Sequence, residues 1–144
     1  IGAMAAIAPG SDLVIQGALA TALTRELAKL YGVPVSDVQI DDFLRQARLT
    51  LRTGSSLVLA IAGNALKAFP GLGTLGGGVL HAFAYALIFD SLGRALATSL
   101  AERESLDQED AADKLKALLA DGSAARMKEL ATLTLDAWKE KASQ

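Results

Sequence analysis

Apolar residues recur three or four positions apart along most of this chain of 144 residues, and no segment shows strict alternation with polar residues. That spacing puts apolar side chains on one face of an α-helix, whereas a half-buried strand needs alternation. One such stripe consists of Leu19, Leu23, Leu27 and Leu30. Hydrophobic residues make up 51% of the chain and aromatic residues only 5%, so the apolar content is mostly alanine and leucine, which favour helices. The sequence predicts an all-α fold.

Glycine, proline and capping residues divide the chain into about six helices in a compact bundle. Ser36 and Gln39 form a capping box, and Asp107 with Asp110 marks another helix start. Gly54 is expected to end one helix, because glycine weakens helices. The predicted helices span roughly residues 11–31, 36–53, 56–69, 75–104, 107–120 and 123 onward.

Charge divides the chain unevenly. Residues 1–100 hold 13 charged side chains, whereas the much shorter segment 101–144 holds 17, ten of them acidic. We therefore expect an apolar helical core domain over residues 1–104 and a C-terminal amphipathic helical pair over 105–144 that packs on it. A net charge of −2 gives no reason to expect a nucleic-acid partner. The chain opens at Ile1, and we expect it to be a segment of a longer protein.

Two charge-free stretches, Thr53–Leu66 and Ala68–Phe89, are the most apolar parts of the chain. Proline and glycines interrupt the second, so the helical residues from about Leu75 to Phe89 are too few to span a bilayer alone. A central hairpin of the bundle and a re-entrant element that dips into lipid are both open, and we favour the bundle core. Its predicted turn consists of Pro70, Gly71, Gly73, Gly76 and Gly77.

The same turn fits the dinucleotide fingerprint G-x-G-x-x-G from Gly71 to Gly76. That fingerprint needs a preceding strand, and the residues before it look helical. We therefore expect a tight turn between helices and no cofactor. The single histidine, His81, lies between apolar neighbours and favours a core or interface position over a metal ligand. With no cysteine in the chain, zinc–thiolate sites are excluded.

Two sets of charged residues are candidate sites. Arg45, Arg48 and Arg52 follow helical spacing on the side opposite Phe43 and Leu44, where they form either a lipid-headgroup site or an ordinary solvated face paired with nearby aspartates. In the last core helix, Asp90 and Arg94 stand four residues apart and predict a structural ion pair.

Three segments carry a family resemblance: LAKLYGVPVS (27–36), NALKAFPGLGTLGGG (64–78) and FDSLGRAL (89–96). In order and spacing they resemble the bacterial domain of unknown function found C-terminal to Era-like GTPase domains and in YcjF-type inner-membrane proteins. The similarity covers about Pro9 to Glu104. The family pattern has small residues or threonine where this chain has Phe89 and Asp90, so Asp90 takes no role from it. The resemblance implies an accessory module at the cytoplasmic side of the inner membrane, often tied to a GTPase.

The sequence thus predicts a protein that binds and does not catalyse. We expect a membrane-proximal docking or regulatory domain, cytoplasmic or peripheral at the inner membrane, with a GTPase domain and an anionic membrane surface as partners. Two alternatives stay open: a structural module that forms a homodimer, and a helical domain that holds a hydrophobic ligand.

Overall fold

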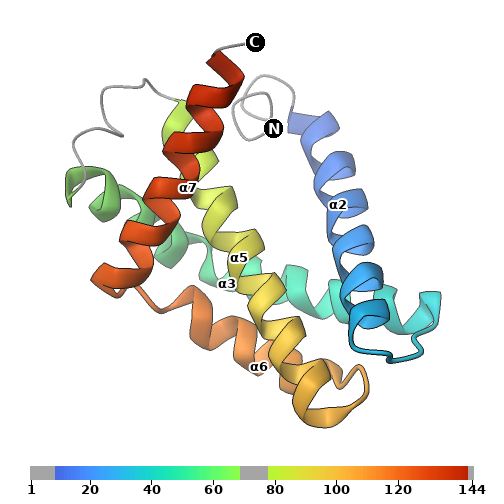
Figure 1. The fold of residues 1–144 in the computed structure, drawn as a ribbon. Coiled ribbons are helices and arrows are strands. Elements are labelled where there is room, and N and C mark those ends of the chain that lie inside the picture. Colours follow the sequence, from blue (N-terminus) through green and yellow to red (C-terminus); the bar gives the residue numbers. More distant parts are fainter. Residues whose placement is uncertain (1–8, 69–77, 143–144) are drawn as a thin grey trace.

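The structure, a computed structural model, describes residues 9–68 and 78–142, and its regular elements there are all helices (Figure 1). The all-α bundle expected from the sequence is confirmed. The helices are α2 (Pro9–Leu30), α3 (Asp37–Ala68), α5 (Gly78–Arg103), α6 (Gln108–Leu119) and α7 (Ala124–Ala142).

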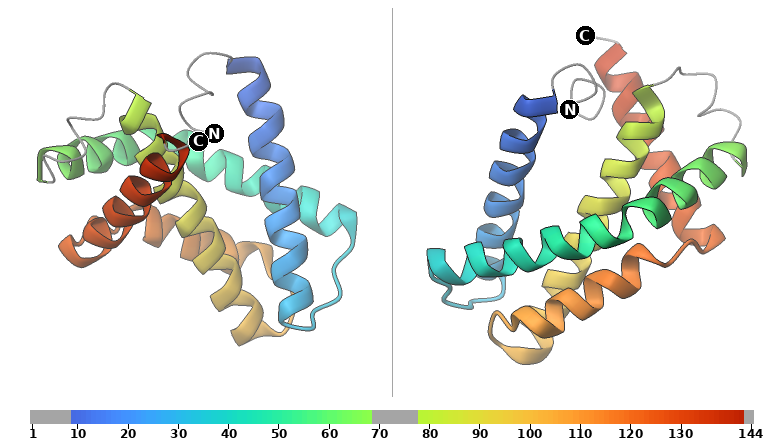
Figure 2. Two further views of the ribbon diagram at one scale, coloured as in Figure 1. Left: turned by 45° about the horizontal axis from the view of Figure 1, so that its top comes forward. Right: turned by 180° about the vertical axis from the view of Figure 1, so that it is seen from behind.

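The helices form two layers, and α5 lies in the middle of one of them. Seen from behind in Figure 2, α3 and α6 lie side by side in front, with α2, α5 and α7 behind them. Helix α5 packs against α2, α3, α6 and α7, whereas α2 and α7 flank it on opposite sides. This central place explains why α5 is the most apolar helix, since little of its circumference faces water.

A single cluster of buried side chains fills the space between the layers. Phe43 of α3 and Phe83 and Leu87 of α5 are fully buried in it. Leu115 of α6 and Leu130 of α7 belong to the same cluster, so residues 105–144 share one core with the first 104. The change in charge density near residue 101 therefore lies within one packed unit.

The corner between α2 and α3 has two well-formed caps. Gly32 adopts a left-handed φ of 66° after the last turn of α2, and the N–H of Val33 reaches back to the carbonyl of Ala28 at 2.9 Å. The predicted capping box is confirmed, because the Ser36 N–H donates to Gln39 Oε1 at 2.8 Å and the Gln39 N–H donates to Ser36 Oγ at 3.2 Å. These caps fix the direction in which α3 leaves the corner.

The expected break at Gly54 is wrong, because α3 continues through it from Asp37 to Ala68. The hydroxyls of Thr50 and Thr53 donate to the carbonyls four residues earlier, as they do in an unbroken helix. Buried residues also keep helical spacing on both sides of the glycine, with Ala47 before it and Val58 after it. Packing along one face therefore outweighs the roughly 1 kcal/mol that a glycine costs inside a helix.

The other helix ends lie close to their predicted places. Helix α2 begins at Pro9 and not at the predicted cap Ser11, since proline suits the first helical position. Glu104, with a φ of 55°, follows the end of α5. The carboxylate of Asp107 then accepts the Asp110 N–H at 3.0 Å and caps α6 as predicted.

Candidate functional site

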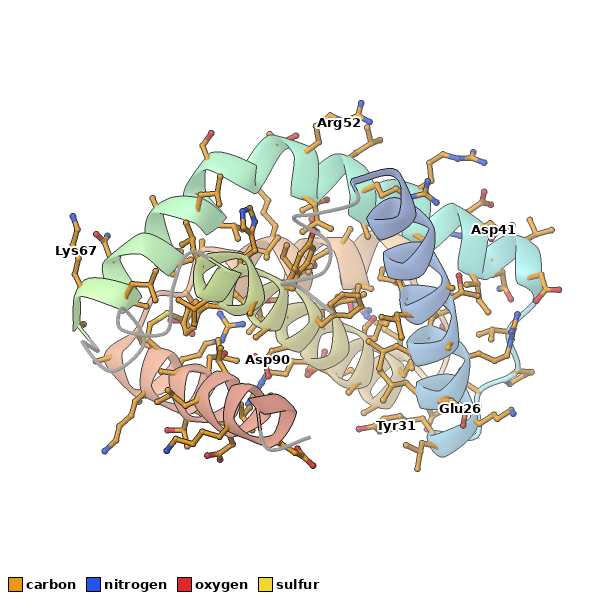
Figure 3. The ribbon with its side chains drawn as sticks, turned by 90° about the horizontal axis from the view of Figure 1, so that it is seen from above. Glu26, Tyr31, Asp41, Arg52, Lys67 and Asp90 are labelled. Atoms are coloured by element: carbon orange, nitrogen blue, oxygen red, sulfur yellow. The ribbon has the colours of Figure 1, made fainter. Side chains whose placement is uncertain are left out.

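A charged network joins the middle of α5 to α7. Asp90 forms the predicted pair with Arg94, whose Nε lies 3.0 Å from Oδ1 and 3.1 Å from Oδ2. Its Oδ2 also accepts from Arg126 of α7 at 3.2 Å, and Arg94 reaches Glu129 of α7 at 3.3 Å. Figure 3 shows Asp90 between the two helices. The hydrogen bond with Asp90 raises the pKa of Arg94 further above its ordinary value. Asp90 therefore lies at the centre of a clamp between α5 and α7.

Arg126 is the buried member of this network, with a side chain only 8% exposed. Its guanidinium donates to Ser91 Oγ at 2.6 Å and to the carbonyl of Asp121 at 3.0 Å, and it also donates to the carbonyl of Leu118. Leu118 lies in the last turn of α6 and Asp121 just beyond it, where carbonyls lack partners within the helix. Arg126 thus closes the end of α6 and ties it to α5, which is a structural role.

A second network joins the end of α5 to the start of α6 around Asp110. Its carboxylate accepts from Ser99 Oγ at 2.7 Å, from Lys114 Nζ at 2.9 Å and from Arg103 at 3.3 Å. The hydrogen bond from Ser99, followed by that from Lys114, lowers the pKa of Asp110 to about 2. A carboxylate held ionised by three donors is a poor general acid or base near neutral pH. This network also serves the fold.

Neither network resembles a reaction centre. The carboxylates of Asp90 and Asp110 both accept from cationic or hydroxyl donors, some on their own helix and some on a neighbouring one. Within residues 9–68 and 78–142, no group of three His, Asp or Glu side chains is placed to hold a metal ion. His81 is exposed, so a core position is wrong for it, and the alternative of an interface position stays a prediction.

The third candidate is the outer face of α3, the side of this helix turned away from α5. Arg45, Arg48 and Arg52 are all exposed there, while Phe43 and Leu44 are buried on the opposite side, as the spacing predicts. Figure 3 shows Arg52 and Lys67 pointing away from the bundle. We define the outer face by its residues Val38, Asp41, Arg45, Arg48, Leu49, Arg52, Leu59 and Lys67.

One arginine of this face has an acidic neighbour one turn away on the same helix. Arg45 lies 3.8 Å from Asp42, an exposed pair one turn apart. Surface pairs of this kind hold a side chain only weakly. The sequence from Phe43 to Lys67 contains no acidic residue at all, so the middle and end of α3 form a positively charged stretch.

Large apolar side chains accompany the arginines on the same face. Val38 is 68% exposed, Leu49 56% and Leu59 49%. Their spacing from Val38 to Leu59 follows the arginines along one side of an unbroken helix. Single exposed leucines are ordinary, but a row of them between cations is the composition of a docking surface.

One described helix, α5, is long and apolar enough to cross a membrane by length and composition, with a mean hydropathy of 1.3 over its most apolar window. The central helix of a compact bundle passes the same test, and α5 packs on four neighbours. The apolar stretch Ser56–Ala68 is the second half of α3 and not a separate short helix. The two charge-free stretches of the sequence therefore belong to the second half of α3 and, where described, to α5.

The predicted turn of Pro70, Gly71, Gly73, Gly76 and Gly77 lies outside the described residues. The segment before it ends in helix α3 at Ala68, whereas a dinucleotide fingerprint follows a strand. Arg126 and Asp110 are the site residues that the spacing analysis missed. Arg126 stands four residues before Leu130 and eight before Thr134 on the apolar side of α7, and a cation in that register was the available signal.

Comparison with known proteins adds no relative. No family model matches the chain, and no match was found among curated proteins or solved structures. The resemblance to the domain next to Era-like GTPases therefore stays a prediction.

Proposed function

We propose that this chain is a non-catalytic helical accessory module that docks on an anionic membrane surface through the outer face of α3. The observation that carries the proposal is the row of exposed arginines, Arg45, Arg48 and Arg52, alongside exposed Leu49 and Leu59 on one face of an unbroken helix. Interfacial helices combine these two features, because cations attract headgroups while apolar side chains enter the acyl boundary.

The charges are large enough to matter. A lysine or arginine near an anionic bilayer contributes about 1 kcal/mol, so the three arginines together contribute about 3 kcal/mol at low salt. That corresponds to roughly a hundredfold in affinity. Exposed leucines add an attraction that salt does not screen. Neither α3 nor α5 needs to leave the bundle for docking, because the outer face of α3 already points away from the bundle.

The wider setting rests on the family resemblance. The charged networks of the bundle are structural. This is consistent with an accessory module that is tied to a GTPase domain and is cytoplasmic and peripheral at the inner membrane. A hydrophobic-ligand carrier has no specific observation in its favour, because the described core is filled by packed side chains. One specific observation favours self-association, and it concerns this same outer face of α3.

Co-flotation with lipid vesicles tests the proposal. The parent chain, the triple variant R45Q/R48Q/R52Q and a control K116Q/K128Q/K139Q are floated with phosphatidylglycerol-containing and with pure phosphatidylcholine vesicles. The control removes the same charge from exposed positions of α6 and α7. We expect the parent to float with anionic vesicles only and to be released as the Debye length falls from about 10 Å at 0.1 M salt to about 3 Å at 1 M.

The triple variant should lose most of this salt-dependent binding, while the control keeps it. Equal losses in both variants would mean that net charge, and not the α3 face, drives binding. A parent chain that stays with neither vesicle at low salt would refute membrane docking.

A further inference from the structure

The outer face of α3 is polarised along its length. Its first turns carry Asp41, with the partly exposed Asp42 at the edge of the face, and the exposed cations Arg45, Arg48 and Arg52 follow within the next three turns. The anionic bilayer proposed above complements only the second part, because the aspartates would face headgroups of their own sign. The first part also exposes Val38, at the α2–α3 corner. The first part of this face therefore has no complementary partner if the protein docks only on an anionic membrane.

A second copy of the same face supplies both missing complements. When two α3 helices meet antiparallel about a two-fold axis, the acidic first turns of one lie against the arginines of the other, and each contact occurs twice. The apolar residues Val38 and Leu49 lie in the same row as the charges, so pairing removes them from water as well. A parallel arrangement would instead set aspartates against aspartates and arginines against arginines.

The corner that carries this face is held in place before any partner arrives. Arg25 of α2 bonds Asp37 of α3 at 2.8 Å, the capping box closes the first turn, and Val33 is buried beneath the connection. Because the backbone is already fixed, pairing orders only surface side chains, and little conformational freedom is lost on association. The helix is also unbroken through Gly54, so the residues from Val38 to Arg52 lie on one continuous helix.

We infer that, away from a membrane, the outer face of α3 pairs with the same face of a second copy in an antiparallel dimer. The pairing covers Arg48 and Arg52, so the dimer withholds the residues that bind lipid. This regulatory part rests on the proposed membrane docking, whereas the pairing itself does not. Anionic lipid and a second copy then compete for one surface.

Charge exchange tests the pairing. The variant D41R/D42R makes the face basic throughout, and R48D/R52D makes it largely acidic, so each should repel its own copy. Sedimentation velocity over a dilution series should show the parent as a concentration-dependent dimer and each variant as a monomer, with dimer dissociation constants at least about tenfold higher, since every reversal acts at two symmetric contacts. Circular dichroism melts establish that both variants are folded.

Mixing the two variants is the decisive arm. Opposite faces then meet, so an equimolar mixture should sediment as a heterodimer although neither component dimerises alone. Leu49→Gln, which leaves the charge unchanged, should weaken the parent dimer through its apolar contact. A monomeric parent, or variants that dimerise as the parent does, would overturn the inference.

Flotation separates this inference from the function it builds on. Anionic vesicles should convert the parent dimer to bound monomer, and D41R/D42R should bind at lower lipid concentration than the parent. Flotation without any dimer in solution overturns the pairing and leaves docking intact. A dimer that never floats overturns docking, and the regulatory part with it, while the pairing stands.

Discussion

Replacing Arg126 by methionine should destabilise the fold by about 2–4 kcal/mol. The guanidinium makes hydrogen bonds to Asp90, Ser91 and the carbonyls of Leu118 and Asp121. Loss of a buried partner costs up to about 5 kcal/mol when it leaves an isolated charge. Here Asp90, 20% exposed, keeps both contacts with Arg94 Nε, and the Leu118 carbonyl keeps the Asp121 N–H. The cost therefore comes mainly from the Asp121 carbonyl and Ser91 Oγ, which lose their charged donor.

The substitution by methionine also removes one unfavourable contribution to the free energy of folding. Within the described residues, Arg126 Nε is buried without a hydrogen-bond partner, and an apolar side chain of similar length has no such donor. This places the expected loss below the top of the range. For a chain of 144 residues, 2–4 kcal/mol corresponds to a fall in Tm of roughly 6–12 °C.

Urea unfolding followed by circular dichroism measures the change in the free energy of unfolding. Arg94→Met is the matched control, because that side chain is half exposed and its pairs should contribute only about 0–1 kcal/mol. A double-mutant cycle with Asp90→Asn should give a coupling energy between Asp90 and Arg126 of about 1–2 kcal/mol. If R126M loses no more stability than R94M, the hydrogen bonds of Arg126 to α5 and to the end of α6 do not stabilise the fold as described.

Three further changes should alter stability in defined directions. Gly54→Ala should raise the free energy of unfolding by up to about 1 kcal/mol, since the glycine lies inside a continuous helix and an added methyl meets none of the described atoms within 4 Å; no gain would indicate a break there. Gly32→Ala should instead lower it by about 1–2 kcal/mol, because φ is 66° at that position, and an unchanged thermal melt would contradict the cap. Asp110→Asn should lower Tm near neutral pH. Because the folded pKa of Asp110, about 2, is depressed below its ordinary value of 3.8, the stability it contributes is present above about pH 4 and is lost as the pH falls towards 2. Melts of parent and variant should therefore converge in acid, and a constant difference down to pH 2 would contradict the ionised network.

Local signals in the sequence were sufficient for most of the helix ends. A capping box at Ser36 or an N-cap at Asp107 acts over three residues, so its chemistry is legible without the fold. The break expected at Gly54 failed for the opposite reason. A glycine lowers the local preference for helix, but burial of residues on either side, which depends on α5 and α6, decides whether the helix continues.

The candidate sites divide in the same way. The pair of Asp90 with Arg94 and the exposed row from Arg45 to Arg52 depend on spacing within one helix, and both could be predicted. The contact of Arg126 with Asp90 joins residues 36 positions apart, and no spacing rule reaches that far. An arginine on the apolar side of α7 was a signal for burial, but its partner became known only once α5 and α7 were placed together.

The unbroken course of α3 has a mechanical consequence. A helix of 32 residues has a length of about 48 Å along its axis, and α3 follows that length without a break while it bows around the bundle (Figure 3). One end meets the capped corner with α2, and the other lies next to the glycine-rich segment that leads to α5. A displacement imposed at the corner, by a bilayer or by a second copy, would therefore meet no break in the helix at residue 54 and would be carried along α3 towards Ala68.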